Sequence, residues 1–483
     1  MEEKSGAQIS QKAFIQSFLI LLFLMVLAGI LTLVLPGGAY QRVITDGRDM
    51  IDPTSFQYTA KPDYPVWRWL LAPFEVLTVS GSAVIITIIL FIVLVAGAFA
   101  ILDKSGILNA SISRVVKKFG GRKYLLLFII TFFFMILGAF FGLFEEVVPL
   151  TPLMIALAYY LGWDVLVGLG MSILATNMGF SAALTNPFTI GVAQKLADLP
   201  LFSGIGFRIP IFIAIYLLLA VFLYFYARKI EKNPEKSWVY SEDQTNRHRF
   251  SQMSIDSLDA RHLKLGPALT WFLVFIMLVV VTLFLSPFVP GLSDYSLPLV
   301  GLLFFIGGVG AGLLSGVGRK TVLQAFWEGL TGIAPGIPLI LMAAAVKQII
   351  AGGGVMDTIL YSATQTLSGT NTVVASWMVF LIALLVEFFV ASAGAKAILI
   401  MPIILPVADI IGVTRQIAVL AYCFGDGFSN MAYPTNPVLL ITLGLASIGY
   451  PKWLRWTAPL WAGVMVITLA SLWIANLVHL GPF

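Results

Sequence analysis

Four clusters of polar and charged residues interrupt stretches of the chain that are otherwise strongly apolar. They are Glu145-Glu146, the run from Thr176-Asn177 to Thr185-Asn186-Pro187, Glu387 with the run from Ser392 to Lys396, and the run from Asp426 to Pro437. An ionised side chain in the middle of a membrane is costly, so it should face a cavity or a charged partner. The Gly and Pro residues of these clusters break helices, and freed backbone groups survive in hydrocarbon only where they line a cavity or are buried in protein. The clusters therefore indicate a polar site inside a membrane.

These clusters supply the residues that we expect to bind a solute. Helix N-termini at the breaks can hold a carboxylate, while free carbonyl groups can coordinate Na⁺. The loops at Asn186 and Asn436 are therefore candidate Na⁺ ligands, and no other metal site is assigned. The expected substrate-binding residues are Glu145, Glu146, Asn177, Thr185, Asn186, Ser392, Lys396, Asp426, Ser429, Asn430, Thr435 and Asn436.

Each of these residues also has a structural interpretation. A single Asn or Thr in a membrane helix commonly joins two helices through a hydrogen bond. Glu146 and Lys396 occupy equivalent positions in the sequence repeat described below, so they could form a structural ion pair instead. Glu387 lies in an arm of a predicted hairpin and is assigned a structural role.

The elements that must position these residues are membrane helices. The chain has 483 residues, of which 59% are hydrophobic and 11% charged, whereas soluble domains carry about 25% charged residues. Apolar runs long enough to cross the bilayer are expected near 14–35, 83–101, 208–228, 267–289, 296–316, 334–351 and 458–480. The first run is too long for a cleaved signal peptide. A single cysteine, Cys423, excludes an internal disulfide framework.

Two further kinds of element are expected. Residues 124–162 and 373–412 are too long for one crossing and carry charge at their centres, which predicts two helical hairpins that enter and leave on the same side. Residues 164–203 and 415–447 are broken in the middle by Pro and polar residues. Lys and Arg gather in the short loops that flank one side, so these loops, the N-terminus and the linker 229–265 are expected in the cytoplasm, and the C-terminus outside.

The two halves of the chain resemble each other. Thr185-Asn186-Pro187 matches Thr435-Asn436-Pro437 at an offset of 250, and Pro152 falls on Pro402 at the same offset. The expected topology places the matched segments in opposite orientations, and broken helices at corresponding positions of an inverted repeat are a sequence-level sign of a transporter site. The predicted fold is an all-α polytopic membrane protein with two inverted repeats, re-entrant hairpins and broken helices. We expect repeats at 1–228 and 266–483, joined by the linker 229–265.

Three motifs carry a family resemblance. Gly-Leu-Phe-Glu-Glu-Val (142–147), Gly-Asp-Gly-Phe-Ser-Asn-Met-Ala-Tyr-Pro-Thr (425–435) and Ile-Gly-Val-Thr-Arg-Gln (411–416) resemble the YfcC/ArcD-like branch of the DcuC family, in the ion transporter superfamily. The resemblance covers nearly the whole chain. It implies a scaffold, a mobile transport domain with two hairpins that moves as an elevator, and organic-ion substrates, either basic amino acids or C4-dicarboxylates. It also implies site roles for Glu145, Glu146, Asp426 and Ser429.

Together these patterns predict a secondary active transporter, an antiporter or an ion-coupled symporter, in the inner membrane. Three carboxylates against Lys396 favour a cationic or zwitterionic solute, such as arginine exchanged for ornithine. The alternative is a carrier of C4-dicarboxylates or other organic anions coupled to Na⁺ or H⁺, with Lys396 holding the carboxylates. No cofactor and no nucleic acid are expected, and a homodimer is an open alternative. An intramembrane enzyme fits poorly because the three histidines lie in the linker or near the C-terminus, and a channel would need a continuous polar pore.

Overall fold

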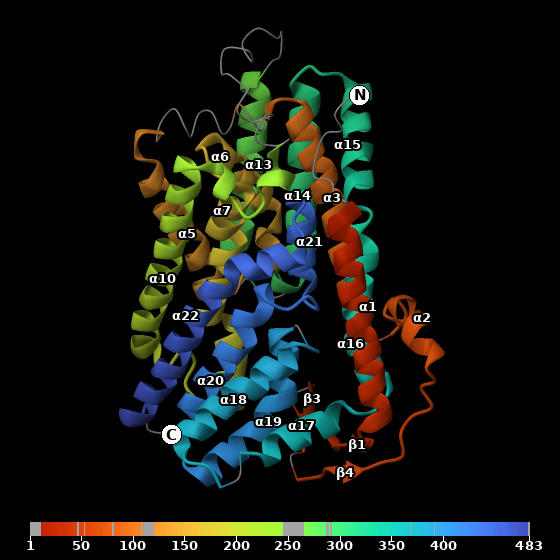
Figure 1. Cartoon of the computed structure of the whole chain (residues 1–483), viewed down its shortest axis with the longest axis vertical. Helices are drawn as coiled ribbons and strands as arrows, with labels where there is room; N and C mark the ends of the chain where they lie inside the picture. Colours follow the sequence, from red (N-terminus) through yellow and green to blue (C-terminus); the bar gives the residue numbers. More distant parts are fainter. Residues whose placement is uncertain are drawn as a thin grey trace.

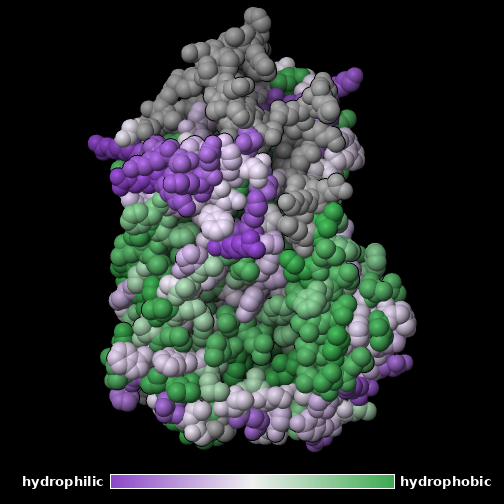
Figure 2. All heavy atoms as spheres, viewed as in Figure 1, coloured by the Kyte–Doolittle hydropathy of each residue, from purple (hydrophilic) through white to green (hydrophobic). Residues whose placement is uncertain are grey.

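The computed structural model describes residues 11–45, 48–52, 54–79, 82–107, 110, 120–244, 265–285, 289, 292–367, 369–390 and 392–481. Within these ranges nine helices or helix pairs are long and apolar enough to cross a membrane. The space-filling view shows an apolar belt with polar residues gathered above it and fringing it below (Figure 2). The chain is therefore a multi-pass membrane protein, as its hydropathy predicted.

The predicted spans are helices. They are α1 (Gln11–Val34), α3 (Ser82–Lys104), α10 (Ile205–Lys232), α13 (Leu265–Leu285), α14 (Leu292–Leu314), α16 (Gly336–Gly352) and α22 (Tyr450–Leu477). Two amphipathic helices, α2 (Trp67–Glu75) and α15 (Arg319–Ile333), precede α3 and α16. A further helix, α17 (Met356–Gln365), follows α16.

Both predicted hairpins are pairs of helices. The first consists of α5 (Lys123–Phe141), the short η2 (Glu145–Leu150) and α6 (Thr151–Tyr160). The second consists of α18 (Thr372–Glu387) and α19 (Ala393–Ile411). In Figure 1, α5 and α6 lie in the upper part of the molecule, whereas α18 and α19 lie at the lower end.

Each hairpin is followed by a broken helix. After the first come α7 (Val165–Leu169), the π-helical η3 (Gly170–Leu174), α8 (Ala175–Ala182), a break, η4 (Pro187–Gly191) and α9 (Val192–Leu196). After the second come α20 (Arg415–Gly427), η6 (Phe428–Met431), a break and α21 (Pro437–Leu445). Asn186 and Asn436 cap the helices that restart, and Pro follows as the first helical residue, where its missing N–H costs nothing. The Asn-Pro pairs thus explain both restarts.

The helices pack in two groups. The first consists of two bundles, α3 with α13, α14 and α15, and α16 with α1 and α2, which touch through α3 and α16. The second contains both hairpins, both broken helices, α10 and α22. Within the first group the two halves of the chain are interleaved: α3 packs against α14 and α15, while α16 packs against α1 and α2. The two groups meet chiefly where α14 contacts η2 and α16 contacts α21. In Figure 1, α1 and α16 stand on the right and α10 on the left.

Four short strands correct the all-α prediction. β1 (Gly38–Ala39) pairs with β4 (Gln57–Tyr58), and β2 (Arg42–Thr45) pairs with β3 (Arg48–Ile51), both antiparallel. They lie in the polar loop between α1 and α2, which has no apolar run of helical length. Asp357 of α17 holds this loop by accepting hydrogen bonds from Arg42 Nη2 at 2.8 Å and from the Tyr40 backbone N–H at 3.0 Å.

The first residues of the linker are fastened to the helices beneath them. Asp164, which is fully buried, caps α7 by accepting a hydrogen bond from Val167 N, and its other oxygen accepts from Tyr226 Oη at 2.6 Å and from Ser237 Oγ at 2.7 Å. Asp243 accepts a hydrogen bond from the Tyr159 hydroxyl at the end of α6. Residues 233–244 therefore belong to the same packing group as the first hairpin.

Candidate functional site

A buried ion triad joins the second hairpin to the second broken helix. Lys396, in the first turn of α19, forms ion pairs with Glu387 at the end of α18 and with Asp426 Oδ1, the latter at 2.8 Å. The side chains are 0% exposed for Lys396 and 1% for both carboxylates. The structure thus brings together two predicted site residues, Lys396 and Asp426, and adds Glu387 to them.

This triad corrects the alternative pairing of Lys396 with Glu146. Among the described residues, the ion pairs of Lys396 are those with Glu387 and Asp426. Lys396 points back to its own hairpin because eight residues at the tip turn the chain so that Glu387 and Lys396 face each other. The sequence analysis assigned Glu387 a structural role in a hairpin arm. The signal for its pairing was that Glu387 and Lys396 carry opposite charges on the two sides of one hairpin tip.

The hairpin tip is also anchored to α20 by a hydroxyl. Tyr422 Oη donates a hydrogen bond to the carbonyl of Ala393 at 2.5 Å and lies 3.5 Å from Asp426 Oδ1. Asp426 Oδ2 is buried and accepts no hydrogen bond from the described residues. Ser392, at the tip, is exposed. The tip therefore leaves one carboxylate oxygen of Asp426 available next to the ammonium group.

The two broken helices cross beside Asp426. Asn177 Nδ2 donates to the carbonyl of Phe428 at 3.4 Å, while the buried Asn177 Oδ1 has no hydrogen-bond partner among the described residues. A Cβ on Gly427 would lie 2.5 Å from Ser181 Oγ, so the glycine permits this close approach. The Ser429 hydroxyl, one helical turn after Asp426, donates a hydrogen bond to the carbonyl of Gly425 at 3.3 Å. At this crossing Asn177 Oδ1 and Asp426 Oδ2 are both buried without a hydrogen-bond donor among the described residues.

The Thr-Asn-Pro loops have their hydrogen bonds largely satisfied within the protein. Asn186 Oδ1 accepts from the N–H groups of Phe188 and Thr189, and Asn436 Oδ1 accepts from Val438 N at 2.9 Å. Asn436 Nδ2 donates to Asn430 Oδ1 at 2.8 Å. These contacts give both Asn residues a capping role, which the sequence interpretation as Na⁺ ligands did not consider.

Two threonines complete the loops. Thr185 Oγ1 donates to the Phe140 carbonyl at 3.0 Å, which satisfies a free carbonyl at the end of α5. Thr435 is buried, with 8% of its surface exposed. The Thr185 contact ties the first loop to the first hairpin.

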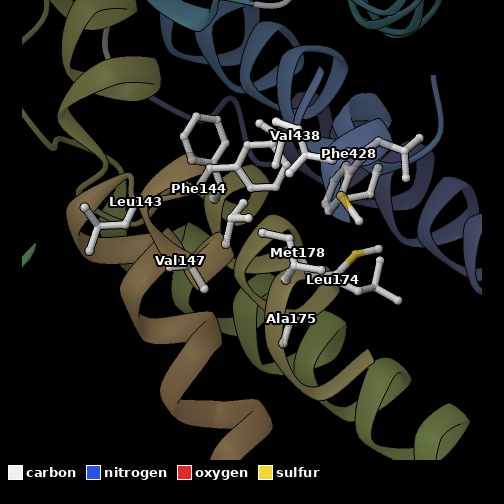
Figure 3. Packing of buried hydrophobic residues seen from close by; sticks show 14 of the residues in the cluster. Leu143, Phe144, Val147, Leu174, Ala175, Met178, Phe428 and Val438 are labelled. Atoms are coloured by element: carbon white, nitrogen blue, oxygen red, sulfur yellow. The ribbon is translucent and has the colours of Figure 1, made fainter. Parts of the chain in front are cut away.

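The first hairpin tip packs through apolar side chains. Figure 3 shows Leu143, Phe144 and Val147 of the tip beside Leu174, Ala175 and Met178 of the first broken helix and Phe428 and Val438 of the second. Glu145 and Glu146 lie between Phe144 and Val147 in the chain and are half-buried. Glu146 Oε2 accepts a hydrogen bond from Phe144 N at 3.2 Å. Since η2 contacts α14, these two carboxylates lie near the boundary of the two helix groups.

One buried cation was missed by the sequence interpretation. Arg208, in the first turn of α10, is 1% exposed and donates to the carbonyls of Leu184, Phe202 and Ser203 at 2.7–3.2 Å. It therefore fixes the chain before the first Thr-Asn-Pro loop. An arginine at the first position of the predicted span 208–228 was the available signal.

The described residues contain no group of three or more His, Cys, Asp or Glu side chains that could hold a metal ion.

Spanning helices, helix breaks and a buried charge cluster between them define the class as a multi-pass membrane transporter. The chain belongs to the DcuC family, described as C4-dicarboxylate anaerobic carrier, whose pattern matches residues 14–477. It is a carrier and not an enzyme.

Two relatives cover most of the chain. The chain is 30% identical over 475 residues to YfcC of Escherichia coli, provisionally named a basic amino acid antiporter, with 91% of this chain and 92% of that protein covered. It is 27% identical over 395 residues to an uncharacterised protein of Haemophilus influenzae, with 80% and 75% covered.

Two solved structures are more distantly similar. The YdaH transporter of Alcanivorax borkumensis is 18% identical, with a TM-score of 0.43, and covers 97% of this chain and 100% of its own. MtrF of Neisseria gonorrhoeae, described among antimetabolite efflux pumps, is 20% identical, with a TM-score of 0.42, and covers 94% and 93%.

Proposed function

We propose that the protein is a secondary active transporter of small carboxylate-bearing metabolites, foremost basic amino acids such as arginine and ornithine. The observation that carries this proposal is the buried triad of two carboxylates and one ammonium group. Two acids against one base leave the cluster one positive charge short, and a buried net charge is costly in a membrane protein. A solute that brings one cationic group would complete the balance.

The alternative substrate is a C4-dicarboxylate, which the family's description favours. That alternative assigns the substrate carboxylates to Lys396. In this structure Lys396 already faces two carboxylates of the protein, so it would have to leave both before it could bind an anion. The charge of the triad therefore supports the cationic solute.

We also propose that the two halves form inverted repeats and that the second helix group moves as an elevator against the first. Asn177 and Gly427 are separated by the repeat offset of 250 and lie together at the crossing of the broken helices. The interleaved packing of α3 and α16 is reciprocal, as a two-fold relation would require.

We place the protein in the inner membrane with the linker in the cytoplasm, because Lys and Arg gather at that end of the helices. This orientation can be tested by cysteine labelling. The buried Cys423 would be replaced by Ala, and Ser241→Cys or Thr59→Cys would be added at exposed positions. In right-side-out vesicles an impermeant maleimide should label Thr59→Cys at once and Ser241→Cys only after permeabilisation. The reverse pattern would invert the topology.

A counterflow screen tests the substrate. Purified protein in liposomes loaded with arginine should accumulate labelled ornithine or arginine from outside, with saturation. Liposomes loaded with succinate, citrate or a short-chain acid should not drive that uptake. Counterflow with succinate and none with arginine would replace the proposal by the dicarboxylate alternative.

A further inference from the structure

We infer that Glu387 is the residue that sets the charge of the binding site. When the cationic group of a substrate binds to Asp426, Glu387 remains as the counter-ion of Lys396. This inference rests on the proposed transport of a cationic amino acid. It gives a specificity and coupling role to a side chain that the family resemblance and the sequence analysis left without one.

The geometry separates the three charges into two parts. Glu387 and Lys396 flank the tip of the same hairpin, whereas Asp426 belongs to α20. Lys396 bridges the two parts through its ion pairs with both carboxylates. A group that enters between the tip and α20 can therefore displace Lys396 from Asp426 without separating it from Glu387.

The free acceptor lies where such a group would bind. Two carboxylate oxygens of the triad, Asp426 Oδ2 and Glu387 Oε1, are buried and accept no hydrogen bond from the described part of the chain. Of the two, Asp426 Oδ2 belongs to α20 and not to the hairpin that carries Lys396. Leaving a buried carboxylate oxygen without a hydrogen-bond donor costs free energy, so a ligand that supplies a donor gains that energy on binding. A guanidinium or ammonium group would supply donors to both oxygens of Asp426, while Glu387 keeps Lys396 neutralised.

The charge count then separates the empty and the loaded carrier. With all three groups ionised, the empty triad carries one net negative charge, and a bound monocation makes it neutral. Moving an uncompensated charge through the apolar interior is unfavourable. The loaded site should therefore move across the membrane and the empty site should not, which is the requirement for strict exchange.

Two single variants shift this balance in opposite directions. Glu387→Gln leaves Lys396 and Asp426 as a neutral pair, so a cationic solute must compete with Lys396 for one carboxylate. Its affinity for arginine should fall by about tenfold or more. Its loaded site would carry one net positive charge, so arginine exchange should become slow. Lys396→Met removes the competitor, so arginine should bind more tightly while exchange becomes slow.

The double variant Glu387→Gln/Lys396→Met restores the original count. Its site is negative by one charge when empty and neutral when loaded, as in the wild type. We expect it to regain both the arginine affinity and the arginine exchange that Glu387→Gln loses. Lys396→Arg keeps the charge and serves as the control for a purely steric effect.

The experiment uses liposomes loaded with labelled arginine. Efflux is measured into buffer alone and into saturating ornithine, and binding is measured by arginine-induced thermal stabilisation. The expected result is high exchange for the wild type and the double variant, slow exchange for each single variant, and low net efflux into buffer for all of them.

Three outcomes would contradict the inference. If the wild type exchanges arginine and Glu387→Gln keeps both its affinity and its rate of exchange, the inference is wrong while the proposed function stands. If the double variant folds but shows no recovery over Glu387→Gln, the triad is structural. If the wild type exchanges no basic amino acid, the proposed function fails and the inference with it.

Discussion

Replacing Asp426 by Asn should abolish transport of a cationic solute and leave the protein folded. The variant keeps the size of the side chain, and Lys396 keeps Glu387 as its counter-ion, so no buried charge is left alone. The solute, in contrast, loses the carboxylate to which it binds. Removing one partner of a buried charge pair costs about 2–5 kcal/mol, which weakens binding roughly 30-fold or more.

The measurement compares arginine exchange in liposomes with thermal unfolding of the same preparations. Asp409→Asn is a matched control, since Asp409 pairs with Arg415 at 3.0 Å and is 42% exposed. An exposed ion pair contributes at most about 1 kcal/mol, so this control should transport normally. Normal arginine exchange by a folded Asp426→Asn carrier would show that the substrate binds elsewhere, with Glu145 and Glu146 the next candidates.

Replacing Asp164 by Ala should cause a large loss of stability. The carboxylate satisfies the N-terminus of α7 and accepts hydrogen bonds from Tyr226 and Ser237 while fully buried. Alanine would leave these donors without their acceptor, and each buried unsatisfied group costs about 1–3 kcal/mol. We expect about 3–5 kcal/mol in total, seen as a lower melting temperature of the purified protein in detergent.

A second cap isolates the contribution of burial. Asn371 caps α18 through Val374 N at 2.9 Å in an exposed position. Asn371→Ala removes a cap alone and should cost about 1 kcal/mol. If Asp164→Ala is no more destabilising than Asn371→Ala, the buried hydroxyls contribute little and the linker is not fastened by this residue.

The sequence predicted the helices well because hydrocarbon imposes a simple length and composition rule. The breaks after residues 182 and 431 were also predictable, since Asn-Pro interrupts a helix and restarts it. The strands between α1 and α2 were not, because pairs of two to four residues leave no periodic signal. The short strands instead depend on a remote anchor, Asp357.

The partner of Lys396 could not be derived from the repeat. Equivalence at an offset of 250 relates Glu146 to Lys396 by position in each hairpin, whereas an ion pair requires the two side chains to meet in space. The two hairpins lie towards opposite ends of the molecule (Figure 1). The acids that pair with Lys396 come from its own hairpin and from α20. Asp164 and Arg208 were missed because single charges near helix ends resemble ordinary interfacial residues.

The interleaved packing of α1, α3, α14, α15 and α16 bears on the order in which the protein can be assembled during synthesis. About 300 residues separate the end of α1 from the start of α16, against which it packs. At roughly 5–20 residues per second, the ribosome needs on the order of 15–60 s to make that stretch. During this time α1 and α3 must persist in the bilayer as separately inserted helices, held by lipid contact and their own hydrogen bonds. The high apolar content of these two helices is thus as much a requirement of biogenesis as of the finished fold.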